Sequence, residues 1–134
     1  MENAEFWTIR GNNLFDQEKF KDSLIAYNLA LKIDPCDKFA LVGRGAALGA
    51  LGMHLQALRA FESALKIDPN YDTALCNKGL SLIHLGRYRD AIAIFNRSID
   101  LNPKDGRARY CKGIAYAKIG NNRKAFQFLT DNLT

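Results

Sequence analysis

Apolar positions recur along the chain at intervals of three and four residues, which is the spacing of one face of an α-helix. Leu41, Gly45 and Leu48 follow this spacing, and the run from Ala57 to Leu65 follows it again after a short gap. No stretch alternates apolar and polar residues as a half-buried strand would. The pattern therefore predicts an all-α protein in which short helices come in pairs.

The paired pattern repeats with a period of 34 residues, marked by Pro35, Pro69 and Pro103. A fixed period of this size indicates one supersecondary unit copied along the chain, and each copy must stack on its neighbours to bury its apolar face. Proline lacks an amide hydrogen and restricts the residue before it, so each proline is expected to stop the second helix of its unit. The units are 4–37, 38–71, 72–105 and 106–134, and the last is incomplete.

The eighth position of every unit is a glycine. These glycines are Gly11, Gly45, Gly79 and Gly113. A glycine inside a helix costs roughly 0.5–1 kcal/mol relative to alanine, so four copies indicate a place where a second helix leaves no room for a Cβ. The large side chain at position 24 is expected to fill that place, and the residues there are Tyr27, Phe61, Phe95 and Leu129.

The combination of period and positions resembles the tetratricopeptide repeat (TPR) family over essentially the whole chain. The first repeat matches at Trp7, Gly11, Phe20, Tyr27, Ala30 and Pro35, and the third at Leu75, Gly79, Leu82, Tyr88, Ala91, Phe95 and Pro103. The resemblance implies about three and a half to four repeats in a single domain over residues 1–134. It also implies an α-solenoid, a right-handed superhelix of tandem antiparallel helix pairs.

The resemblance further implies a concave groove, lined by the first helix of each repeat, that holds a peptide or helical segment of a partner protein. The positions that face this groove in the family carry Thr8, Asn12, Phe39, Val42, Ala46, Thr73, Cys76, Asn77, Leu80, His84, Arg107, Tyr110, Cys111, Ile114 and Lys118. Apolar residues in the middle and cations at the C-terminal end fit a partner with central apolar side chains and a carboxylate near Arg107 and Lys118. The alternative is that Val42, Leu80 and Ile114 only pack between adjacent helices.

Some members of this family clamp the terminal carboxylates of heat-shock chaperones with a lysine, two asparagines and two basic residues at fixed positions. In repeats 1–3 those positions hold Thr8, Asn12, Gly43, Thr73 and Asn77, of which only Asn12 matches. In repeats 2–4 only Asn77 and Arg107 match. A carboxylate clamp needs several charged donors, so the sequence argues against a chaperone-tail receptor.

The net charge of +5 is unevenly distributed, with −3 over residues 1–37 and +5 over residues 106–134. This polarity leaves two alternative functions open. Nucleic acid could bind the basic last repeat, where cations surround Tyr110; these cations are Arg107, Arg109, Lys112, Arg123 and Lys124. Alternatively, copies of the chain could assemble through their acidic and basic ends.

Two departures from the family pattern concern the surface. Position 7, usually leucine, carries a cation in every repeat, and we expect Arg10, Arg44, Lys78 and Lys112 to lay their aliphatic stems over the core. The fourth repeat stops before its proline, so Phe126, Phe128 and Leu133 are expected to be partly exposed. Such an uncapped face would suit self-association or a continuation in a longer protein.

The remaining composition argues against chemistry and against a membrane location. Cys36, Cys76 and Cys111 form no Cys-x-x-Cys pair, and neither histidine stands at a metal-ligand spacing from them. We therefore expect no metal, no cofactor and no enzymatic activity. The N-terminus lacks the basic region of a signal peptide, and no apolar run approaches the ~20 residues of a membrane span. These features and the unpaired cysteines favour a soluble, cytoplasmic protein.

Overall fold

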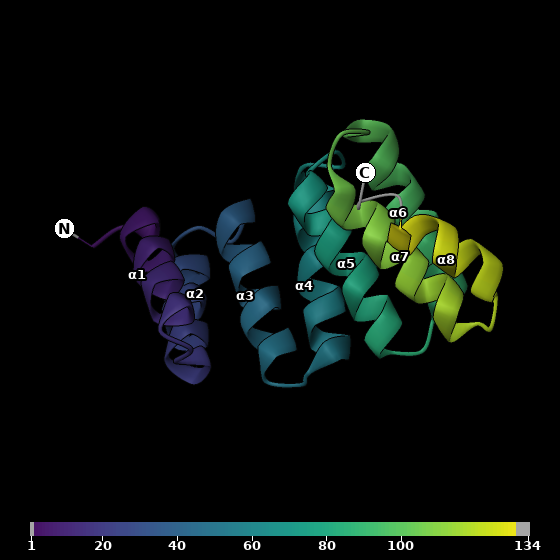
Figure 1. Cartoon of the computed structure of the whole chain (residues 1–134). Helices are drawn as coiled ribbons and strands as arrows, with labels where there is room; N and C mark the ends of the chain where they lie inside the picture. Colours follow the sequence, from purple (N-terminus) through teal and green to yellow (C-terminus); the bar gives the residue numbers. More distant parts are fainter. Residues whose placement is uncertain (1, 131–134) are drawn as a thin grey trace. The chain divides into compact units, whose positions relative to one another are not determined.

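A computed structural model describes residues 2–130, and within this range the chain forms eight α-helices and no strand. They are α1 (Ala4–Asp16), α2 (Phe20–Ile33), α3 (Lys38–Ala50), α4 (His54–Ile67), α5 (Asp72–His84), α6 (Tyr88–Leu101), α7 (Gly106–Lys118) and α8 (Asn122–Thr130). Consecutive helices form antiparallel pairs (Figure 1). The prediction of an all-α protein built from tandem helix pairs is confirmed, with one pair in each expected repeat.

The helices fall into two compact units, Met1–Ala74 and Leu75–Thr134, with the boundary inside α5. In the first unit α1 packs on α2, α2 on α3 and α3 on α4. One core cluster there is built around Tyr27 and a second around Phe61, which are 2% and 3% exposed. In the second unit α7 packs on both α6 and α8, and Phe95 is fully buried.

The four glycines of position 8 lie directly under the side chains expected to cover them. A Cβ added to Gly45 would lie 2.5 Å from Cε1 of Phe61, and one added to Gly79 would lie 2.4 Å from Cε1 of Phe95. Carbon atoms do not approach one another this closely without displacement. The close approach of the two helices therefore requires glycine, as the sequence predicts.

The second helices of the first three repeats end two residues before their prolines. Asp34 follows α2 in an extended conformation, and its carboxylate accepts a hydrogen bond from the backbone N–H of Cys36. Asp68 does the same for Asn70 after α4. The extended conformation before Pro35 and Pro69 is the one that proline favours for its preceding residue, and all three helices end where the sequence predicts.

The turn inside each helix pair contains a residue with a left-handed backbone, which the apolar spacing did not indicate. Gly52, Gly86 and Gly120 have φ angles of 81°, 77° and 83°. In the first repeat Glu18 occupies the same position with φ of 60°. Because a Cβ disfavours this conformation, the first turn is more strained than the other three.

Apolar side chains of α8 are exposed, as predicted for the incomplete fourth repeat. Phe126 is 71% exposed and Phe128 is half-buried. The third residue of that prediction, Leu133, lies outside the described residues. Within residues 2–130, none of the helices combines the length and apolar character needed to cross a membrane.

Candidate ligand-binding surfaces

The two polar candidates on α1 are already engaged inside the first unit. The hydroxyl of Thr8 is buried, where it donates to the carbonyl oxygen of Ala4 at 3.0 Å and lies 3.1 Å from Oδ2 of Asp37. The side-chain oxygen of Asn12 accepts a hydrogen bond from the hydroxyl of Tyr27. Thr8 therefore ties α1 to the start of α3, and the structure does not present it as free surface for a ligand.

Among the candidates of the second repeat and Thr73, packing and exposure separate the residues clearly. Val42 is 8% exposed and belongs to the core cluster around Phe61, so for this residue the packing alternative holds. Gly43 is half-buried, and a Cβ added there would lie 2.3 Å from Cε1 of Tyr27. Phe39 is 59% exposed, whereas Ala46 and Thr73 are half-buried. The exposed aromatic ring is the dominant apolar feature among these predicted ligand positions.

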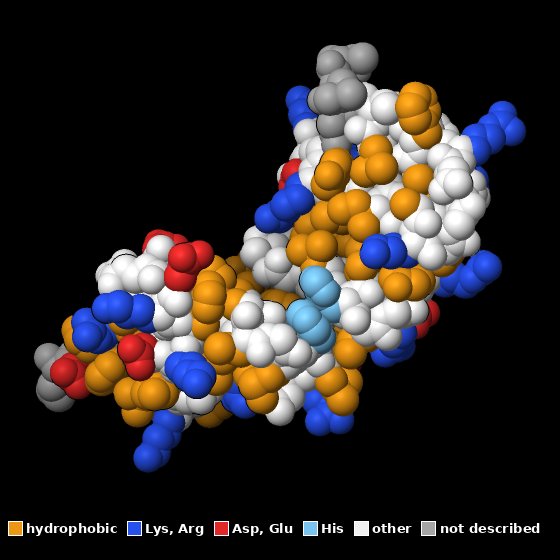
Figure 2. Space-filling model, turned by 60° about the horizontal axis from the view of Figure 1, so that its bottom comes forward, with side chains coloured by type: hydrophobic (Ala, Val, Ile, Leu, Met, Phe, Trp, Pro, Cys, Tyr) orange, Lys and Arg blue, Asp and Glu red, His pale blue; other side chains and the backbone are white. Residues whose placement is uncertain are grey.

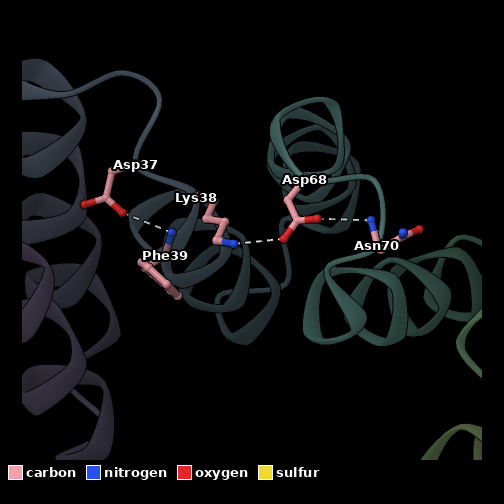
Figure 3. Close-up of polar contacts among 5 residues, drawn as sticks. All are labelled: Asp37, Lys38, Phe39, Asp68 and Asn70. Carbon is pink, nitrogen blue, oxygen red and sulfur yellow. Dashed lines mark hydrogen bonds and ion pairs between the residues drawn. The ribbon is translucent and has the colours of Figure 1, made fainter. Parts of the chain in front are cut away.

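Phe39 belongs to a small cluster at the start of α3 that the sequence did not predict. Its ring meets that of Tyr71 edge-on with centroids 6.0 Å apart, and the ammonium of Lys38 lies 5.4 Å and 5.0 Å from the two centroids. Lys38 also forms an ion pair with Asp68 at 2.8 Å (Figure 3). The sequence places the cation Lys38 beside the aromatic Phe39 at the start of this helix, but it does not show that the fold brings Tyr71 next to Phe39.

The Lys38–Asp68 pair shifts the pKa values of both partners. The hydrogen bond from Lys38 lowers the pKa of Asp68, and the same bond raises the pKa of Lys38. Asp68 also accepts the N–H of Asn70, while Asp37 caps α3 by accepting the N–H groups of Phe39 and Ala40 (Figure 3). These contacts hold the start of α3 in place and so orient the exposed ring of Phe39.

In the second unit, the two cysteine candidates are buried. Cys76 is 1% exposed and Cys111 is 6% exposed. Burial raises the pKa of the Cys111 thiol to about 11, so it stays protonated and unreactive at neutral pH. Their assignment as ligand-facing side chains is therefore not supported, and both thiols fill the interior.

The other predicted residues of this unit reach the surface from two helix faces. Asn77, Leu80 and His84 share one face of α5, and the first two are half-buried. The corresponding face of α7 carries Arg107, Tyr110, Ile114 and Lys118. Tyr110 is 48% exposed, and Figure 2 shows hydrophobic side chains reaching the surface beside lysines and arginines. These two faces combine apolar, amide and cationic groups.

Lys112 lies over aromatic rings. This contact concerns the predicted packing of the position-7 cations and the predicted binding of a nucleic acid by the last repeat. Its ammonium is 4.5 Å from the ring centroid of Phe128 and 6.0 Å from that of Tyr116, and these two rings stack with centroids 5.6 Å apart. Burial and the nearby charge of Lys124 lower the pKa of Lys112. For Lys112 the charged group itself lies over aromatic rings, whereas the prediction placed the aliphatic stem over the core and the charge in water. The same contact removes it from the set of cations free to meet a nucleic acid.

Clustered metal ligands are not apparent in the part of the chain that the structure describes. Within residues 2–130, no three His, Cys, Asp or Glu side chains gather closely enough to hold a metal ion. Among the described residues the three cysteines form no disulfide, and Cys36 is exposed.

Comparison with known proteins gives the class of the chain. Models of the tetratricopeptide repeat family match residues 40–71 and 73–105. Together with the tandem helix pairs of the described residues, these matches show that the chain belongs to the tetratricopeptide repeat family. No curated protein sequence is significantly similar to the chain.

Several solved structures share the fold. The Sgt2 TPR domain from Aspergillus fumigatus is 23% identical with a TM-score of 0.83, over 90% of this chain and 82% of that one. MamA from Desulfovibrio magneticus RS-1 is 25% identical with a TM-score of 0.86, over 98% and 76%. The first TPR of Spaghetti (RPAP3), solved with the HSP90 peptide SRMEEVD, is 19% identical with a TM-score of 0.85, over 88% and 94%. TPR domains are in general protein-interaction modules.

Proposed function

We propose that this chain is a non-enzymatic scaffold or adaptor module that holds a peptide or helical segment of a partner protein on the surface of its first helices. The observation that carries the proposal is the exposure of aromatic rings at predicted ligand positions, 59% for Phe39 and 48% for Tyr110. Aromatic residues are enriched where proteins bind one another. The family and the peptide complex of the Spaghetti TPR support the same class of function.

The residues proposed to contact the partner are the predicted ones that reach the surface. In the first unit they are Asn12, Phe39, Ala46 and Thr73, and in the second they are Asn77, Leu80, His84, Arg107, Tyr110, Ile114 and Lys118. Leu80 and Ile114 supply apolar contact, while Arg107 and Lys118 favour a carboxylate of the partner. The positions of a chaperone-tail clamp remain mostly unmatched, so a chaperone tail is not the proposed ligand. The exposed thiol of Cys36 favours a location in the reducing cytoplasm.

Nucleic-acid binding by the basic last repeat is the rival function. The ammonium of Lys112 lies over the rings of Phe128 and Tyr116, so one of the five cations in that prediction is engaged locally. Tyr110 remains exposed, but fewer free cations surround it than the sequence suggested. The structure therefore favours a protein partner over a nucleic acid.

A pull-down from cell lysate, with and without nuclease, tests the proposal. The variant Asn77→Ala/Leu80→Glu changes the exposed face of α5. The matched control Ala93→Glu/Asn96→Ala makes the same substitutions three residues apart on α6, where both residues are exposed. We expect the wild type and the control to recover the same protein after nuclease treatment, and the α5 variant to lose it. If all three forms recover the same material and nuclease treatment abolishes that recovery, the nucleic-acid function is supported instead.

A further inference from the structure

A hollow of about 760 Å³ lies between α6 and the turn joining α7 to α8, on a part of the second unit that the proposed function does not use. It is lined by Arg89, Ile92, Tyr116, Ile119, Gly120, Asn121, Asn122, Arg123 and Lys124. Its volume is within the range of ordinary ligand sites, roughly 300–1,000 Å³. Nothing in the family pattern singles out this set of residues.

The charge of the hollow has one sign. Arg89, Arg123 and Lys124 line it, and all three are exposed, whereas no Asp or Glu is among the lining residues. Asp90 lines an adjoining hollow, where it forms an ion pair with Arg87 at 3.0 Å. Neither Arg89 nor Arg123 forms an ion pair with any of residues 2–130. Three like charges beside one concavity whose own lining contains no carboxylate favour an anionic ligand.

The two arginines hold equivalent places in consecutive repeats, since Arg89 and Arg123 are 34 residues apart. Each therefore stands at the start of the second helix of its repeat, one in the first turn of α6 and the other in the first turn of α8. Arginine presents a planar fork of N–H groups that matches carboxylate and phosphate oxygens two at a time. The repeat thus places two anion-binding side chains along one edge of the second unit.

The floor of the hollow indicates what else the ligand carries. Ile92 and Ile119 are half-buried and line it together with the cations. The ring of Tyr116 is already stacked on Phe128, with planes inclined by 10°, and the ammonium of Lys124 lies 5.2 Å from its centroid. A ring engaged in this way offers little face to a nucleobase, and single-stranded nucleic acids bind largely by such stacking. Aliphatic side chains between cations suit an acidic peptide better.

We propose that this hollow is a second binding site, separate from the first-helix surface, for an acidic protein segment. The segment places carboxylate or phosphate groups against Arg89, Arg123 and Lys124, and an aliphatic side chain against Ile92 and Ile119. Such a site would let the chain hold two segments at once, or two parts of one partner, and so raise its effective affinity.

Fluorescence anisotropy with the full chain and two labelled probes tests this site. One probe is a glutamate peptide with a central leucine, and the other is the same peptide with phosphoserines in place of some glutamates. We expect Arg89→Gln/Arg123→Gln to weaken binding of both probes about tenfold, because charge-assisted hydrogen bonds are lost. The control Arg10→Gln/Lys32→Gln removes the same net charge from exposed positions of the first unit and should change the affinity little. The probe bound more tightly by the wild type identifies the source of the anion.

Three outcomes would overturn the proposal. They are equal weakening in the two double variants, no binding of either peptide by the wild type, and tighter binding of an oligothymidylate than of both peptides. Asn77→Ala/Leu80→Ala, which alters the first-helix surface without changing the charge, should leave peptide binding unchanged. Loss of binding in that variant would move the acidic segment to the surface of the proposed function. Far-ultraviolet circular dichroism of every variant verifies that the helices are retained.

Discussion

In both the α3–α4 repeat and the α7–α8 repeat, a large side chain of the second helix covers a glycine of the first helix, but the covering residue differs. In the former, the ring of Phe61 covers Gly45 and would lie 2.5 Å from an added Cβ. In the latter, Leu129 covers Gly113, and the corresponding distance is 3.0 Å. Phe61 is 3% exposed, whereas Leu129 is half-buried. The glycine is kept in both repeats, so the close approach of the two helices matters more than the residue that fills it.

The aromatic group missing from position 24 of the last repeat is present nearby. Phe128 precedes Leu129 and stacks on Tyr116, and Lys112 lies over both rings. The last repeat also carries a net charge of +5 over residues 106–134, against +2 over residues 38–71. The comparison indicates that a repeat can change both the side chain that covers its glycine and its net charge while keeping its helix pair.

Truncation of the side chain that covers the glycine should give the largest difference between the two repeats in the free energy of unfolding. Phe61→Ala is expected to lower the free energy of unfolding by about 3–5 kcal/mol, the usual loss for a buried ring. Leu129→Ala should lower it by less than half as much, because Leu129 is smaller and half-buried. Urea denaturation followed by circular dichroism measures both. Equal losses would mean that the two sites are equally well packed.

Filling the glycine site should have the next largest effect. Gly45→Ala introduces a Cβ against Phe61, and overpacking of this kind costs typically ~1–3 kcal/mol, more than the ~0.5–1 kcal/mol that alanine gains in a helix. Gly113→Ala should cost less, because a flexible leucine can move aside. Gly49, on the same helix as Gly45, is the control, since its added Cβ would be 3.9 Å from the nearest atom. Gly49→Ala should therefore stabilise the chain, and destabilisation there would contradict the packing explanation.

The helix caps distinguish the repeats on a smaller scale. Asp37 accepts the N–H groups of Phe39 and Ala40 and is bonded to Thr8, whereas the side chain of Asp105 caps α7 at the N–H of Arg107 alone. Loss of a cap costs about 1 kcal/mol, so both alanine variants should lower the thermal midpoint. Asp37→Ala should lower it further, because the buried hydroxyl of Thr8 loses a partner. Double variants that combine each alanine substitution with Thr8→Val test this explanation. In the Thr8→Val background, the additional fall in thermal midpoint caused by Asp37→Ala should disappear, whereas the effect of Asp105→Ala should be unchanged.

The Lys38–Asp68 ion pair should give the smallest effect, and a dependence on pH and salt. The pKa of Asp68 is lowered in the folded chain, so its contribution to stability is complete above the ordinary value of 3.8 and is lost as the pH falls through the lowered pKa. The pKa of Lys38 is raised above 10.5, so its contribution is lost only as the pH rises through that higher value. The difference in unfolding midpoint between wild type and Asp68→Asn should shrink in strong acid and in high salt. A difference that persists in acid would assign the effect to the turn at Asn70.

The sequence predicts the helix pairs, their proline stops and the covered glycines because each depends on local spacing. It did not indicate the left-handed turn at Gly52, since a period gives no backbone angle. It also placed Val42, Cys76 and Cys111 on the ligand surface, because family positions do not reveal how closely a neighbouring helix covers a side chain. The hollow at Arg89 and Arg123 went unnoticed, although the repeat itself contained the signal in two arginines one period apart.

The proposed function requires that the first helices form the surface that meets a partner protein. The most direct test is photo-crosslinking in nuclease-treated lysate, with p-benzoylphenylalanine replacing Leu80 on α5 or Ala93 on α6. We expect irradiation to join a defined protein to the chain from position 80 and not from position 93. Crosslinks from position 93 alone, or the same products from both positions, would contradict the claim.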